Sequence, residues 1–272
     1  MKITLVDVPP DRTAPLLEAL AEAGSVRAVE VYAECGSTND LARERAREAP
    51  LPLLVVAERQ TRGRGRRGAG WLDVRGACAL MTLAWRPSGL RAYLMPLVGI
   101  AGAAAAARAA RDLGVPAEVK WPNDVWAGDR KLGGVLAESV TLGSTVSLAV
   151  VGIGINVLAT PEGVGPSESA VTPTCMAEFV PTAGLDPYAF VAAVVEQITR
   201  LIDDRGCPRT EAIVGIAREL DALKGRQVTV LLRSSTVTGT AAGVDPSGLL
   251  TLCLRDGTTV SVDDPSATVR LV

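Results

Sequence analysis

The chain has 272 residues, of which 48% are hydrophobic and 21% charged, a balance typical of a folded globular protein. Its formal net charge of −2 excludes a surface that binds nucleic acid over its whole extent, and the absence of histidine excludes mechanisms that use a Ser–His or Cys–His pair. Five cysteines without a CxxC spacing disfavour both a disulfide framework and a zinc cluster.

The first half of the chain predicts intermixed strands and helices. Residues 1–30 are typical of a short strand followed by a helix that ends at Gly24, and they are too few for an independent DNA-binding module. A strand is expected near 28–35, followed by a helix whose N-cap lies within residues 37–40. Residues 51–59 and 76–85 predict strands on either side of an arginine-rich segment.

The second half predicts an alanine-rich helix over 91–113 and then more strands. Strands are expected over 117–140, with a hairpin about Gly128–Asp129, and over 145–157. A loop at 160–184 and helices near 186–204 and 208–222 follow, and from residue 224 short strands alternate with turns. We therefore expect an α+β fold: a mixed β-sheet flanked by helices over residues 1–222, and a small β domain over 223–272.

The N-terminus has no apolar run of signal-peptide length. The longest uncharged stretch, residues 92–107, is too short to span a bilayer and is better interpreted as a buried helix. We therefore expect a cytoplasmic protein with no membrane partner.

The segment QTRGRGRRGAGW, residues 60–71, concentrates four arginines and four glycines in twelve residues. It contains GxGxxG, but a dinucleotide-binding motif should open a helix, and here another strand is expected instead. Glycines let the backbone approach a ligand closely, and arginine forks suit carboxylate and phosphate oxygens. Four like charges repel unless an anion answers them, so we expect a loop that a polyanionic ligand orders.

A second group of polar residues is KWPND, residues 120–124. Across the expected hairpin stands Lys131, which should lie close to Asp124, so that two of the chain's four lysines meet one carboxylate. Two further signals are weaker. Helix capping explains the serine, threonine and asparagine at 37–39 on local grounds. Asn156, at the end of an apolar strand, has two interpretations: it reads a base edge or it ends the strand.

Five motifs occur in one order: GSTN at 36–39, Q-x-x-GRGRRG-x-x-W at 60–71, KWPND at 120–124, RKLGG-V-L-AE at 130–138 and G-I-G-INV at 152–157. This combination resembles a biotin protein ligase of the monofunctional type without a DNA-binding domain. The resemblance implies a class II synthetase-like catalytic domain followed by a small C-terminal SH3-like β-barrel. Two features depart from the family pattern: Ala69 stands where many members have a basic residue, and the C-terminal ending is looser.

The resemblance also implies roles for individual residues. The ureido end of biotin would be held by Ser37, Thr38, Asn39 and Gln60. The carboxylate and phosphates would be held by Gly63, Arg64 and Arg66, with Trp71 beneath the nucleotide. Lys120 and Lys131 would neutralise the α-phosphate and the activated carboxyl, with Asn123 also at the adenylate. The backbone of Gly134 would lie against biotin, and Asn156 would read adenine.

The implied reaction joins biotin to ATP as biotinoyl-AMP with release of pyrophosphate, and an acceptor lysine then displaces AMP. No protein nucleophile is needed, which agrees with the missing histidine. Asp124 is the candidate to receive or orient the proton of the acceptor lysine. Mg²⁺ is expected with ATP, with ligands that the sequence does not identify. The partner would be the biotin carboxyl carrier domain of a carboxylase, not DNA, and a homodimer is among the assemblies considered.

Two alternative functions are considered. One is a lipoate or octanoyl protein transferase on a related scaffold, whose acyl chain would need a long apolar tunnel. The other is an RNA-binding protein that uses the GRGRRG loop, against which stand the acidic balance and the 3% aromatic content.

Overall fold

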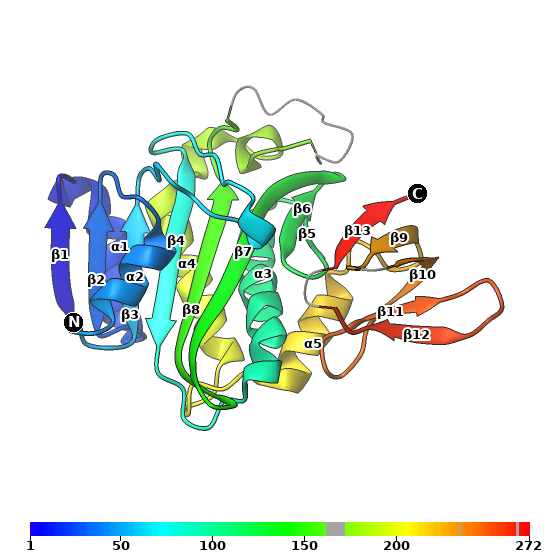
Figure 1. The fold of residues 1–272 in the computed structure, drawn as a ribbon. Coiled ribbons are helices and arrows are strands. Elements are labelled where there is room, and N and C mark those ends of the chain that lie inside the picture. The colour runs from blue at the N-terminus through cyan, green and yellow to red at the C-terminus, as the bar shows by residue number, and fades with distance from the viewer. Residues whose placement is uncertain (162–171, 234, 265–266) are drawn as a thin grey trace.

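The computed structural model describes residues 1–161, 172–233, 235–264 and 267–272, and they form two β-sheets (Figure 1). The larger sheet has eight strands in the order β1-β2-β3-β4-β8-β7-β6-β5, and the smaller has five in the order β12-β11-β10-β9-β13. The α+β class with a mixed sheet and a second, smaller β-sheet is confirmed. The boundary predicted after residue 222 lies between the last helix and the first strand of the smaller sheet.

The larger sheet is parallel at one edge and antiparallel elsewhere. Its strands are β1 (Lys2–Val6), β2 (Ala28–Tyr32), β3 (Leu53–Ala57), β4 (Cys78–Trp85), β5 (Ala117–Lys120), β6 (Asp124–Ala127), β7 (Arg130–Leu142) and β8 (Thr145–Asn156). The pairs β1–β2 and β2–β3 are parallel, and every later pair is antiparallel. The central strands β3, β4 and β8 are almost wholly buried, which explains their unbroken apolar sequences.

Helices cover both faces of this sheet. They are α1 (Pro10–Ala23), α2 (Thr38–Arg45), α3 (Met95–Asp112), α4 (Pro187–Leu201) and α5 (Thr210–Glu219). Figure 1 shows α2 on one face, with α1, α3 and α4 on the other. Short 3₁₀ turns occupy Arg66–Gly68, Ala92–Leu94, Met176–Glu178 and Thr182–Gly184. The expected loop at 160–184 is thus partly 3₁₀, and its residues 162–171 lie outside the described part of the chain.

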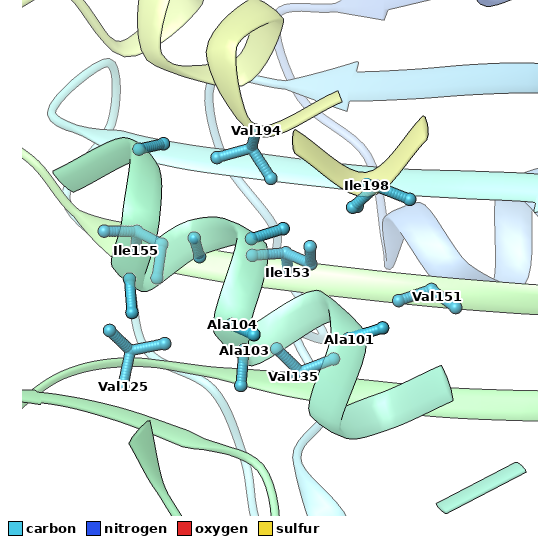
Figure 2. Packing of buried hydrophobic residues seen from close by; sticks show 14 of the residues in the cluster. Ala101, Ala103, Ala104, Val125, Val135, Val151, Ile153, Ile155, Val194 and Ile198 are labelled. Atoms are coloured by element: carbon cyan, nitrogen blue, oxygen red, sulfur yellow. The ribbon is translucent and has the colours of Figure 1, made fainter. Parts of the chain in front are cut away.

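The alanine-rich helix α3 is the centre of the core. Figure 2 shows its alanines against Val135 of β7 and Ile153 of β8, with α4 packed beyond them. A Cβ on Gly102 would come within 2.9 Å of the Val135 side chain, so the helix approaches the sheet too closely for any side chain there. The segment Ala92–Asp112 is apolar and long enough to cross a membrane, but 67% of its apolar window is buried inside the protein. The interpretation as a buried helix is confirmed.

The smaller sheet comprises β9 (Gln227–Leu231), β10 (Thr236–Val244), β11 (Leu250–Cys253), β12 (Thr259–Val262) and β13 (Thr268–Leu271), all antiparallel. Its β10–β11 turn docks on the larger domain, where the indole Nε1 of Trp121 donates a 2.9 Å hydrogen bond to the Gly248 carbonyl. Gly248 has φ +82°, and a Cβ there would lie 2.6 Å from the Leu97 side chain. The KWPND segment is therefore attached directly to the C-terminal module.

Candidate active site

A cleft of about 880 Å³ opens at the junction of the two sheets. Its walls come from the arginine segment, the β5–β6 turn, β7, β8 and residues 267–271. All the residues predicted for the site line it except Gly63. Gly63 instead faces the backbone of Trp71, whose carbonyl oxygen would lie 2.6 Å from a Cβ. Residues separated by more than one hundred positions therefore meet around one cavity of the size that binds small ligands.

The predicted lysine cluster is present. Nζ of Lys131 donates to Asp124 Oδ1 at 2.6 Å, because the β6–β7 hairpin turns at Gly128 and Asp129 and brings Lys131 back along β6. Gly134 leaves room for this pair, since a Cβ there would lie 3.4 Å from the same carboxylate oxygen. Two lysines and one carboxylate converge as the sequence predicted.

Lys120 is the unusual member of the cluster. Its side chain belongs to a residue only 6% exposed, and its ammonium lies 4.7 Å from the centre of the Trp126 ring. Within the described residues, no oxygen lies in hydrogen-bonding range of this ammonium. Burial lowers the pKa of Lys120, opposed by the charge of Asp124 and assisted by Lys131 and Arg66. Lys120 lines the cleft, so this partly desolvated ammonium is open to an anion bound there.

Arg66 reaches the same region from the arginine segment. Its Nη1 donates to Asn123 Oδ1 at 2.9 Å, while Asn123 Nδ2 donates to the Val135 carbonyl at 2.7 Å. Asn123 is therefore held at both ends of its amide and orients the guanidinium. Burial lowers the pKa of Arg66, which agrees with a cation desolvated inside the cleft.

Arg64 has protein carboxylates as partners. It donates to both oxygens of Glu138, at 2.8 and 3.1 Å, and to Asp40 at 2.7 Å. The hydrogen bonds that Arg64 donates to Glu138 are the main cause of its raised pKa. The sequence argument that the arginines need a ligand anion to answer their charge is therefore wrong for Arg64. The carboxylates of Asp40 and Glu138, which are distant in the sequence, already pair with its charge.

A polar pocket lies at the other end of the cleft. Gln60 Oε1 accepts from the backbone N–H of Thr38 at 2.8 Å and from its hydroxyl at 3.1 Å. Ser37 occupies the N-cap position of α2, but its side chain makes no capping hydrogen bond. The prediction of a helix N-terminus at these residues is therefore confirmed, but no Ser37 side-chain hydrogen bond caps the helix. All three are 4% exposed and turned toward the cleft or the sheet.

The floor of the cleft is formed by Trp71 and β8. A Cβ on Gly154 would lie 2.8 Å from the Trp71 indole, so the ring rests directly on the strand backbone. Trp71 Nε1 is buried without a hydrogen-bond partner in the described part of the chain. Asn156, at the end of β8, donates to the Thr174 carbonyl at 3.0 Å and accepts from Cys78 Sγ at 3.6 Å.

Sequence reasoning missed two residues that this geometry brings to the site. Thr82 was hidden in the apolar strand CALMTLAW, where a lone polar residue was the available signal. Glu138 closes the RKLGG-V-L-AE motif and lies two and four residues beyond Leu136 and Gly134, so alternation along β7 places all three on one face. No cluster of three or more metal-binding side chains occurs among the described residues.

Comparisons with known proteins agree with this geometry. Residues 33–156 match the biotin/lipoate A/B protein ligase family, and residues 224–263 match the biotin protein ligase C terminal domain. The chain is 30% identical over 228 residues to the biotin–[acetyl-CoA-carboxylase] ligase of Paracoccus denitrificans, covering 82% of this chain and 92% of that protein.

It is also 35% identical over 176 residues to the enzyme of the same name from Mycobacterium tuberculosis. That alignment covers 60% of this chain and 62% of the relative, just under two thirds of its length. The biotin protein ligase from Aquifex aeolicus in complex with biotin and ATP shares the fold, with a TM-score of 0.71 at 22% identity over 90% of this chain and 99% of that one.

Proposed function

The chain belongs to the biotin protein ligases, within the biotin/lipoate A/B protein ligase family, and from this we propose that it biotinylates a lysine of an acceptor protein through biotinoyl-AMP. The observation that supports this most strongly is the buried Lys120 ammonium, which lacks an acceptor and faces the Asp124–Lys131 pair. A phosphate with a negative charge would supply the missing partner at that position.

In the first step a biotin carboxylate oxygen attacks the α-phosphorus of ATP and displaces pyrophosphate. Lys120, Arg66 and Lys131 stabilise the negative charge that builds on the phosphoryl oxygens, because they are fixed before the substrate arrives. Asn123 holds the Arg66 fork at 2.9 Å and so contributes to this orientation. Alignment of two substrates in one cleft supplies much of the remaining acceleration.

The other predicted residues bind the two ends of the adenylate. Ser37, Thr38 and Gln60 contact the ureido end of biotin, with the Gly134 backbone along its length, and Arg64 lies near the carboxylate. Gly63 lies behind Arg64, against the Trp71 backbone, and does not line the cleft. Trp71 offers its ring to the nucleotide. Asn156 has one Nδ2 hydrogen and one Oδ1 lone pair beyond its bonds to Thr174 and Cys78, and these are the groups with which it would read adenine.

In the second step the ε-amine of the acceptor lysine attacks the carbonyl carbon of the mixed anhydride, the bond to the phosphate oxygen breaks, and AMP leaves. Asp124 receives or orients the amine proton. Its carboxylate is bonded to Lys131 at 2.6 Å, so the lysine must share or release it when the acceptor enters.

ATP and biotin are the substrates, as in the bound complex of the Aquifex aeolicus relative. Mg²⁺ stays a prediction. Asp124 is the one carboxylate among the described residues that line the cleft, which suits an ion carried mainly by the phosphates rather than a protein cage. The acceptor is the biotin carrier domain of a carboxylase, following the name of the relatives. The homodimer and the cytoplasmic location also stay predictions.

The polar pocket favours biotin over lipoate. Ser37, Thr38 and Gln60 place polar groups where a lipoyl or octanoyl chain would require an apolar wall. RNA binding through the arginine segment is disfavoured because Arg64 and Arg66 are bonded to side chains of the protein itself.

The test is ATP–pyrophosphate exchange with biotin or lipoate, followed by labelling of a carrier domain. We expect biotin-dependent exchange that falls about 10²–10³-fold in Lys120→Ala. The matched control is Lys224→Ala, which removes an exposed lysine outside the cleft and should exchange normally. Exchange with lipoate alone, or salt-sensitive RNA retention without ATP turnover, would contradict the proposal.

A further inference from the structure

A continuous hydrogen-bonded chain runs from the polar pocket to the arginine segment. The hydroxyl of Thr82 lies 2.9 Å from Thr38 Oγ1 and 2.8 Å from Asn39 Oδ1. The amide Nδ2 of Asn39 then donates to Glu138 Oε2 at 2.8 Å. Glu138 in turn binds Arg64 at 2.8 Å and Arg43 at 3.0 Å. Strands β4 and β7 and helix α2 each supply a member.

Asn39 is almost fully buried, and its amide makes several hydrogen bonds to the protein. Its Nδ2 also donates to the Leu136 carbonyl at 3.2 Å, so both of its N–H groups are used. A Cβ on Gly152 would lie 1.9 Å from Asn39 Oδ1, which shows that β8 has no side chain there because the amide occupies that space. Both N–H groups of this amide are therefore unavailable to a ligand, although the resemblance assigned Asn39 to the ureido end.

The orientation of this amide is unambiguous. The partners of Nδ2 are a carboxylate and a carbonyl, and both can only accept, so Oδ1 must be the atom that faces Thr82. Thr82 has one hydroxyl hydrogen and two neighbouring acceptors, Asn39 Oδ1 and Thr38 Oγ1. When it donates to Asn39, its lone pairs face Thr38, so the Thr38 hydroxyl can donate its one hydrogen either to Thr82 or to Gln60.

Thr38 controls Gln60 in turn. Oε1 of Gln60 accepts from the N–H of Thr38 at 2.8 Å and lies 3.1 Å from its hydroxyl, so Gln60 presents its Nε2 hydrogens to the cleft, and Thr82 competes for the one hydroxyl hydrogen of Thr38. The donor and acceptor pattern of the pocket therefore depends on residues that lie behind it. Thr82 is fully buried, at 0% exposure, and Glu138 lies at the far end of the chain of bonds.

We propose that Asn39, Thr82 and Glu138 are positioning residues that fix Thr38 and Gln60 for the ureido group of biotin. The inference rests on the proposed function, because it assumes that this pocket receives the ureido end. Thr82 acts through Thr38, and Glu138 acts through Asn39. Since the route from Glu138 passes through Asn39 and then through Thr82, the effects of changing Thr82 and Glu138 are coupled rather than independent.

The test compares Thr82→Val, which keeps the shape but removes the hydroxyl, with Thr82→Ser, which restores it. We expect Thr82→Val to raise the KM for biotin in pyrophosphate exchange about tenfold, the effect of losing one buried hydrogen bond, with the KM for ATP and kcat within about twofold. Thr82→Ser should return the KM for biotin to within about threefold of wild type. The matched control is Thr13→Val, another threonine at 0% exposure, whose hydroxyl bonds to the Pro10 carbonyl away from the cleft.

A second variant tests the chain of bonds from its more exposed end. Glu138→Ala should also raise the KM for biotin. The double variant with Thr82→Val should raise this KM by less than the product of the two single fold-changes. Multiplicative effects, an unchanged KM for biotin in a folded Thr82→Val, or a serine variant that fails to restore it would each overturn the proposal. Loss of biotin-dependent exchange in the wild type would instead refute the proposed function itself, so the two failures are distinguishable.

Discussion

Replacement of Lys120 by methionine should separate activity from stability. Methionine has a similar length and no charge, so it removes the cation and keeps most of the packing against Trp126. Adenylation should fall about 10²–10³-fold, because a preplaced donor at the phosphate is lost. The free energy of unfolding should rise by about 1 kcal/mol or more, because a buried and unpartnered charge is replaced by an apolar group.

The dependence on pH has a definite sign. Burial lowers the pKa of Lys120 below its ordinary value of 10.5, so the unfolded chain binds this proton more tightly than the folded protein does. The free energy of unfolding therefore increases with pH between the lowered pKa and 10.5. Below that range Lys120 is charged in both states, and the full cost of desolvating its charge is present. The advantage of Lys120→Met over wild type should be largest near neutral pH and should shrink as the pH rises through that window.

Thermal unfolding at several pH values and pyrophosphate exchange are the two assays. For a chain of this size 1 kcal/mol corresponds to a midpoint shift of about 2–4 °C. Lys131→Met is the informative comparison, because it breaks the 2.6 Å pair with Asp124 and should not stabilise the protein. A Lys120→Met protein that is less stable than wild type, or that retains full exchange, would refute the view that this ammonium is held for a ligand.

Three further predictions concern the rest of the site and its support. Trp121→Phe should lower the free energy of unfolding by about 1–3 kcal/mol in denaturant titration, because the buried Gly248 carbonyl loses its donor, and an unchanged value would show that this contact is dispensable. Gly133→Ala should lower the free energy of unfolding by about 3 kcal/mol or more, since its Cβ would lie 2.3 Å from a backbone oxygen of β8. Gly215→Ala, with open space around it, should instead stabilise α5 by about 0.5–1 kcal/mol. Glu138→Gln should destabilise the protein by about 1 kcal/mol at pH 7. Burial works to raise the pKa of Glu138, but hydrogen bonds from Asn39 and Arg64 outweigh it and lower that pKa. The stabilisation is therefore present above the unfolded pKa and is lost as pH falls through the folded pKa, where the thermal midpoints of variant and wild type should converge.

Local signals were enough to predict the elements and one part of the site. The strand and helix positions follow from apolar periodicity, and the helix at 91–113 was placed within a few residues of its observed bounds. The Asp124–Lys131 contact could be predicted because both residues belong to one hairpin, so a turn at Gly128 and Asp129 determines their approach.

Motif order also identified the residues that line the cleft, although not their partners. Arg64 was expected to await an anion, and Asn39 was expected to contact biotin. In the structure Arg64 is hydrogen-bonded to Glu138, 74 positions away. The Asn39 side chain is hydrogen-bonded to Glu138, Leu136 and Thr82. Spacing along the chain could not reveal these pairings, because they cross between β4, β7 and α2.

The sequence alone thus determined the family resemblance, the order of the elements and the local meeting of lysine and carboxylate, because each depends on residues close together along the chain. Only the tertiary structure decided which side chains pair with the arginines, that Thr82 lies behind Thr38, and that residues 267–271 line the cleft beside Trp121. The physical reason is register: a shift of one residue in β4 or β7 would turn Thr82 or Glu138 to the opposite face of the sheet.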